Sequence, residues 1–184
     1  MPEQKATDNL LLYDPDFADY AEGFLKEHPT DGIAHAVSNT NDLIEAVKGY
    51  KNVKGLELVL HGSPGNIYFK SKGQMVASYF GTIARAANML APNARVLFLG
   101  CNIAEGDNGD KFLTEVGKNM FTGLGGIAGG TTVTNFVFKG GVTRMNPFWF
   151  LGAQLKVRKF DMTGKMSAGQ DVGYFGGTTN IAVK

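Results

Sequence analysis

Two residues able to carry nucleophilic chemistry, His61 and Cys101, each lie at the end of one of the most apolar segments of the chain. Residues 55–60 (GLELVL) precede His61, and residues 94–99 (ARVLFL), followed by Gly100, precede Cys101. A thiol becomes a strong nucleophile once it loses its proton, and a neighbouring imidazole can favour the thiolate or carry that proton. These two residue types therefore predict a Cys–His catalytic dyad, provided that the fold brings the two segments together.

Glycine stands beside each of these candidates, since Gly62 follows His61 and Gly100 precedes Cys101. A residue without a Cβ would let a substrate backbone approach the site closely. The N–H groups of Gly62 and Cys101 would then face a developing oxyanion, and such stabilisation is typically worth ~3–4 kcal/mol per donor. We expect these two groups to form an oxyanion hole.

Polar residues after Cys101 suggest a substrate pocket formed by Asn102, Glu105 and Asp107. An acidic pocket would favour a basic residue before the scissile bond. The structural alternative is that Asp107, together with Asp110, stabilises the start of a helix, where carboxylates are favourable. In that alternative Asn102 simply makes a turn.

The elements that must position these residues alternate between strands and helices as far as about residue 130. Apolar runs predict strands over residues 9–13, 32–38, 55–60, 66–70, 94–99 and 127–128. Helical spacing predicts helices over 16–27, from an N-cap within 39–41 to 51, over 75–90 and over 107–120. Residues 61–65 are predicted as a turn, and further strands are predicted over 133–139, 149–160 and 173–183. This alternation indicates an α/β fold whose sheet is largely parallel and is joined or flanked by a β-rich C-terminal extension. In such sheets sites gather beyond the carboxyl ends of the strands.

Longer strings around the dyad resemble those of the caspase-like (clan CD) cysteine peptidases. Residues 61–65 read H-G-S-P-G and residues 100–106 read G-C-N-I-A-E-G, each after an apolar strand. They are similar to the H-G-S-P-G and G-C-N-x-A-x-G strings of a bacterial caspase-like domain, over roughly residues 9–135. The resemblance implies a three-layer sandwich around a central, mostly parallel sheet. It also implies Cys101 as nucleophile, His61 as general acid and base, and the Gly62 and Cys101 N–H groups as oxyanion hole. The caspase string Q-A-C-R-G is absent, so aspartate specificity is not implied.

Composition sets the outer bounds of these predictions. Glycine supplies 25 of the 184 residues, about twice the average usage of ~7%. The hydrophobic fraction of 43% is nevertheless enough for a packed core. We expect a single caspase-like domain over 1–184, with its core at about 9–135 and the β-rich part at about 136–184. The single cysteine excludes an internal disulfide and a Cys-based zinc site.

Charge argues against nucleic-acid binding, because the net charge is only +1. The largest local cationic group is Lys156, Arg158 and Lys159, which is typical of a solvated edge strand. Residues 1–9 lack the apolar core of a signal peptide, and no apolar stretch is long enough to span a membrane. We therefore expect a cytoplasmic protein, or one exported without a cleaved signal peptide.

The function these observations favour is a cysteine endopeptidase that cleaves a protein or peptide substrate through an acyl-enzyme, without a cofactor or metal. Two alternatives remain open at this point. One is a non-catalytic interaction module that keeps a caspase-like shell, and the other is a small secreted effector or toxin of bacterial origin. A homo-oligomer is compatible with each of them.

Overall fold

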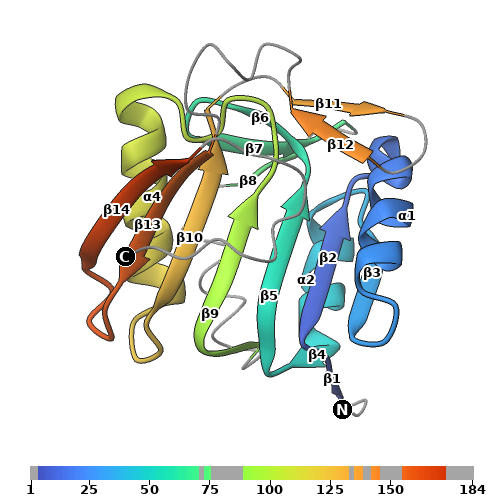
Figure 1. Cartoon of the computed structure of the whole chain (residues 1–184), viewed down its shortest axis with the longest axis horizontal. Coiled ribbons are helices and arrows are strands. Elements are labelled where there is room, and N and C mark those ends of the chain that lie inside the picture. Colours follow the sequence, from blue (N-terminus) through green and yellow to red (C-terminus); the bar gives the residue numbers. More distant parts are fainter. Residues whose placement is uncertain are drawn as a thin grey trace.

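The computed structural model describes residues 4–70, 73–75, 89–132, 135–138, 142–145 and 155–172. Within these ranges the main sheet has seven strands (Figure 1). Five adjacent strands run parallel to one another, the next strand pairs antiparallel with them, and the strand at that edge pairs antiparallel with it in turn. The chain is thus an α/β protein with a mostly parallel sheet, as predicted. Across the sheet the strands are β14 (Met166–Val172), β13 (Leu155–Phe160), β10 (Gly126–Thr131), β9 (Leu90–Phe98), β5 (Val53–Val59), β2 (Asn9–Tyr13) and β3 (Gly32–Ala36).

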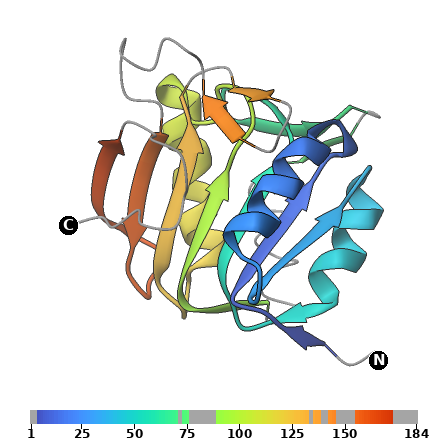
Figure 2. The same ribbon diagram turned by 45° about the vertical axis from the view of Figure 1, so that its right-hand side comes forward.

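Helices cover both faces of this sheet (Figure 2). Because successive side chains of a strand point to opposite faces, Leu10 and Leu12 face one helical layer and Leu11 faces the other. The described helices are α1 (Ala18–Glu27), which packs on the Leu11 face, and α2 (Thr40–Lys48) and α4 (Gly106–Met120), which pack on the opposite face.

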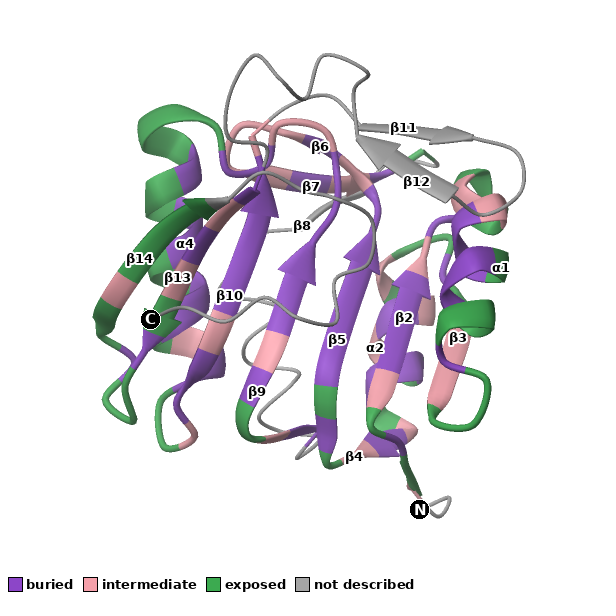
Figure 3. Ribbon diagram, viewed as in Figure 1, coloured by how far each residue is buried: buried purple, intermediate pink, exposed green. Residues whose placement is uncertain are grey.

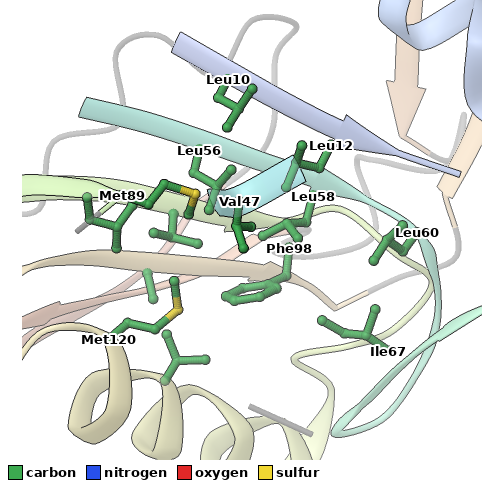
Figure 4. Packing of buried hydrophobic residues seen from close by; sticks show 14 of the residues in the cluster. Leu10, Leu12, Val47, Leu56, Leu58, Leu60, Ile67, Met89, Phe98 and Met120 are labelled. Atoms are coloured by element: carbon green, nitrogen blue, oxygen red, sulfur yellow. The ribbon is translucent and has the colours of Figure 1, made fainter. Parts of the chain in front are cut away.

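The central strands are buried along most of their length (Figure 3). On the face of α2 and α4, Val47 and Met120 pack with Leu56, Leu58 and Phe98 (Figure 4). Burial on both faces explains why these strands read as continuous apolar runs in the sequence. In the described ranges, no helix combines the length and the apolarity that crossing a bilayer requires.

The start of α2 agrees with the capping residue predicted from the sequence, whereas the start of α4 does not. The Asn39 Oδ1 accepts hydrogen bonds from the Asn41 and Asp42 N–H groups, so α2 begins where predicted. It ends at Lys48, three residues early, because the next residues form β4 (Tyr50–Lys51), which pairs with β1 (Lys5–Ala6). The last described helix, α4, starts at Gly106, so Asp107 lies in its first turn and does not cap it.

Two other predictions need correction. Residues 61–65 are not merely a turn, because β6 (His61–Ser63) and β7 (Asn66–Phe69) form a hairpin that continues to β8 (Gly73–Met75). The predicted edge strand is also wrong, because β13 lies between β10 and β14. Two of its three cations are partnered: Lys156 and Arg158 lie 3.0 and 3.3 Å from Asp110.

Several predicted elements fall on residues without a described structure. The helix predicted over 75–90 begins in β8 and ends in β9, and 76–88 lie outside the described residues. The predicted strand over 173–183 also lies outside them. Of the other C-terminal segments, β11 (Asn135–Phe138) and β12 (Val142–Met145) form an antiparallel pair.

Candidate functional site

His61 and Cys101 follow two strands that are neighbours in the sheet, as the prediction required. β5 and β9 pair in parallel, with Leu58 opposite Phe98. The Leu99 N–H extends this pairing by donating to the Leu58 carbonyl at 2.8 Å. Both residues therefore lie beyond the carboxyl edge of the sheet, where the β6–β7 hairpin crosses the strand ends (Figure 1).

The loops that carry the two residues pack directly on each other through their glycines. A Cβ at Gly62 would lie 2.5 Å from Ile103 Cγ1 and 3.0 Å from the Cys101 carbonyl oxygen. A Cβ at Gly100 would lie 2.6 Å from the Leu60 carbonyl oxygen. Loop-to-loop packing thus requires these glycines, whereas the sequence suggested room for substrate. The oxyanion role of the Gly62 and Cys101 N–H groups remains a prediction.

The Cys101 loop is held from β10 and by its own turn. The Thr131 hydroxyl donates to the Gly100 carbonyl, and the Ala104 N–H donates back to the Thr131 carbonyl at 2.8 Å. Asn102 has a φ of 56°, a left-handed conformation that asparagine tolerates. These contacts fix the backbone on both sides of Cys101, which is itself half-buried.

The residues predicted as a substrate pocket have local partners. The Asn102 amide donates to Glu105 Oε2 at 2.6 Å, and the Glu105 N–H donates to the Asn102 carbonyl at 3.0 Å. Asp107 is exposed in the first turn of α4. The turn-forming alternative thus accounts for Asn102 and Glu105, while a contact of Asn102, Glu105 or Asp107 with substrate remains a prediction.

Asp16 is a residue of this site that the sequence reasoning missed. It lies in the 3-10 turn η1 (Pro15–Phe17) after β2, and its Oδ2 is 3.3 Å from His61 Nε2. The signal was available, because Asp16 closely follows a predicted strand, as His61 and Cys101 do. What the sequence did not show is that β2 is the other neighbour of β5.

Two aromatic rings lie beside the His61 imidazole. The Phe17 ring centroid is 5.0 Å from that of His61, and the Tyr68 ring stacks on it at 5.9 Å with an interplanar angle of 16°. Both belong to elements adjacent in the fold, η1 and β7. The imidazole is therefore restrained in its plane and only partly exposed.

Lys70 forms an ion pair with the carboxylate beside His61. Its ammonium lies 2.8 Å from Asp16 Oδ1, and this hydrogen bond is the largest influence that lowers the pKa of Asp16 below the ordinary value of 3.8. His61 lowers the pKa of Asp16 further, though less. The same pair raises the pKa of Lys70. Asp16 is accordingly ionised at neutral pH.

Asp14 connects the backbone of Asp16 with that of Lys70. Its carboxylate is 3% exposed and accepts hydrogen bonds from the backbone N–H groups of Asp16 and Lys70, both at 3.1 Å. One ligand atom each of Asp14, Asp16 and His61 lie within 4.8 Å of one another, a spacing that a metal ion can use. Because Lys70 and these N–H groups already partner the carboxylates, we assign no ion to the cluster.

A polar cavity of about 520 Å³ lies at the other edge of the sheet. Its lining includes Asn9, Gly55 and Arg95, which lie side by side in β2, β5 and β9 at the level where β2 begins. It is therefore separated by the length of the strands from His61 and Cys101. In α/β sheets the carboxyl edge is the usual place of a site.

Comparison with known proteins places both candidate residues within one family. The sequence profile of a family described as "Domain of unknown function (DUF4347)" matches residues 10–132, a span that runs from β2 to the end of β10. No curated protein and no solved structure matches the chain significantly.

Proposed function

The chain belongs to the DUF4347 family, a domain of unknown function, and from this premise we propose that it is a caspase-like (clan CD) cysteine endopeptidase. The observation that carries the proposal is that His61 and Cys101 follow neighbouring parallel strands and sit on loops in direct contact. Helices on both faces of a mostly parallel sheet agree with the three-layer arrangement of that class. The H-G-S-P-G and G-C-N-I-A-E-G strings point the same way.

The proposed reaction is acyl transfer in two steps. The Cys101 thiolate attacks the carbonyl carbon of the scissile peptide, and the Gly62 and Cys101 N–H groups stabilise the resulting oxyanion. As the C–N bond breaks, the His61 imidazolium gives its proton to the leaving amine. Water then attacks the thioester while His61 accepts its proton, the C–S bond breaks, and the carboxylic acid product leaves. Protein or peptide is the substrate, and the chain's own groups suffice for both steps.

Cleavage of a peptide library by the purified protein tests this function. The Cys101→Ala variant should lose all activity above background, and His61→Ala should lose at least about 100-fold, the lower range for a general acid–base group. His35→Ala is the matched control, because His35 is exposed in the edge strand β3, which β2 separates from the strand that leads to His61. A Cys101→Ala protein that cleaves as fast as wild type would overturn the proposal.

Thiol labelling separates the enzyme from a non-catalytic module with the same shell. An electrophilic peptide probe should label Cys101 in wild type much faster than in His61→Ala, because only the enzyme needs an activated thiol. Equal and slow labelling of both proteins, together with no cleavage, would instead favour the interaction module.

A further inference from the structure

We infer that Asp16 is a positioning residue for His61 and completes a Cys101–His61–Asp16 triad, an inference that rests on the proposed function. The strand order places the three residues in line. β5 lies between β2 and β9, so His61, which follows β5, lies between the loop after β2 and the loop after β9. Three residues from distant parts of the sequence thus follow three neighbouring strands, in the order Asp16, His61, Cys101.

The contact between Asp16 and His61 is specific to one ring nitrogen. Asp16 Oδ2 lies 3.3 Å from His61 Nε2, so Nδ1 is the nitrogen turned away from Asp16. A small turn of the ring would bring Nε2–H into hydrogen-bond geometry with the carboxylate. Nδ1 is then left to exchange a proton with the thiol and with the leaving amine. A carboxylate in this position also stabilises the imidazolium, because an opposite charge nearby favours the charged form. Asp16 itself keeps its charge throughout the reaction.

The structure holds Asp16 as firmly as a positioning role needs. Its backbone N–H is bonded to Asp14, its Oδ1 to Lys70, and the next residue, Phe17, packs on the His61 ring. Among the residues that the structure describes, the titratable groups around His61 and Asp16 are Asp14, directly after β2, and Tyr68 and Lys70, from β7 and its end. Cys101 follows on the loop after β9, whose backbone packs against Gly62. Lys70 binds the Asp16 oxygen that does not face His61.

The decisive measurement is the pH dependence of Cys101 alkylation by iodoacetamide in the full chain, made alongside peptide cleavage. Asp16→Asn should shift the midpoint of the alkylation profile to higher pH. It should also lower kcat at least about 10-fold with little change in KM, because an amide stabilises the imidazolium poorly. Asp16→Glu should recover part of both effects. Glu22→Gln, which removes an exposed carboxylate from α1, should change neither.

Lys70→Met distinguishes positioning from mere structural support. If Asp16 only ties the end of β7 to η1 through Lys70, Lys70→Met should reproduce the Asp16→Asn profile. If Asp16 acts on His61, Lys70→Met should leave the alkylation midpoint close to that of wild type.

The outcomes separate the inference from the proposed function. An alkylation profile of Asp16→Asn identical to wild type, in a chain that does cleave peptides, overturns the role of Asp16 alone. Absence of cleavage by wild type overturns the endopeptidase. In that case the alkylation profiles still decide whether Asp16 acts on Cys101 through His61.

Discussion

At the scale of single residues, Gly62 and Gly100 show that the two motif loops are built to touch. Neither belongs to the glycines with positive φ in the described part of the chain, so no left-handed turn demands glycine there. The demand comes from neighbours: Ile103 lies against both positions. Because the two loops are in contact, His61 and Cys101 lie on adjacent loops at the same edge of the sheet.

Substitution of Gly62 by alanine should therefore disturb both stability and the site. The added methyl group would lie 2.5 Å from Ile103 Cγ1 and 3.0 Å from the Cys101 backbone carbonyl oxygen, so we expect a loss of about 1–3 kcal/mol in the free energy of unfolding. Urea unfolding measures the loss, and iodoacetamide alkylation measures the change at Cys101.

Gly169→Ala is the matched control for this substitution. The nearest atom to its Cβ is Cδ of Arg158 at 3.0 Å, on a flexible side chain. Gly169→Ala should therefore lose clearly less free energy of unfolding than Gly62→Ala. If Gly62→Ala were as stable as wild type, the loops would not be in the contact described.

At the scale of elements, the end of β10 supports the Cys101 loop. Thr131 is fully buried, and its hydroxyl and carbonyl bond to Gly100 and Ala104, on either side of Cys101. A strand that carries no proposed catalytic group thus positions the nucleophile. The hairpin of β6 and β7 does the same for His61, through the stacked Tyr68 ring.

Thr131→Val tests this support, because it keeps the side-chain shape and removes the hydroxyl. The loss of one buried hydrogen bond should cost about 0.5–1.5 kcal/mol and reduce the rate at which Cys101 is alkylated. Thr7→Val is a suitable comparison. Thr7 is also buried, and its hydroxyl bonds to the Asn9 and Asp31 carbonyls at the other edge of the sheet. Thr7→Val should lose a similar free energy of unfolding and keep the Cys101 alkylation rate. If alkylation of Cys101 slowed equally in Thr131→Val and Thr7→Val, a local effect of β10 on Cys101 would be contradicted.

At the scale of the whole molecule, the C-terminal strands are part of the main sheet. β13 pairs with β10 over the full length of both strands, from Gly126 opposite Phe160 to Thr131 opposite Leu155. Leu155 and Val157 are fully buried, and the Phe160 ring stacks on Phe121 with centroids 5.6 Å apart. The family profile ends at residue 132, yet the core continues beyond it.

Phe160→Ala should therefore destabilise the whole molecule by about 3–5 kcal/mol, the usual cost of emptying a buried phenylalanine site. Thermal unfolding followed by circular dichroism should show a single, earlier transition. Met162→Ala, in the same hairpin but 67% exposed, should change stability by no more than about 0.5 kcal/mol. A Phe160→Ala protein as stable as the Met162→Ala protein would mean that β13 is peripheral.

Local sequence signals were sufficient for most of the element positions. Residues 9–13 and 94–99 are apolar runs of strand length, and Asn39 caps a helix with its own side chain, so these features depend on neighbours in the sequence. The positions of His61 and Cys101 after two such runs also followed from the chain alone. The sequence thus determined the mostly parallel α/β class and the two residues proposed for catalysis.

Only the tertiary structure decided which strands are neighbours, because pairing joins residues far apart in the sequence. That order places β2 beside β5 and so brings Asp16 to His61, and it places β14 outside β13, which turns a predicted edge into an interior strand. It also decided what Gly62 and Gly100 are for, because the atoms that exclude a Cβ there include those of residues on the other loop. Residue types and hydrophobic periodicity are local properties of the sequence, whereas the orientation of the His61 imidazole depends on contacts with residues of other strands and loops.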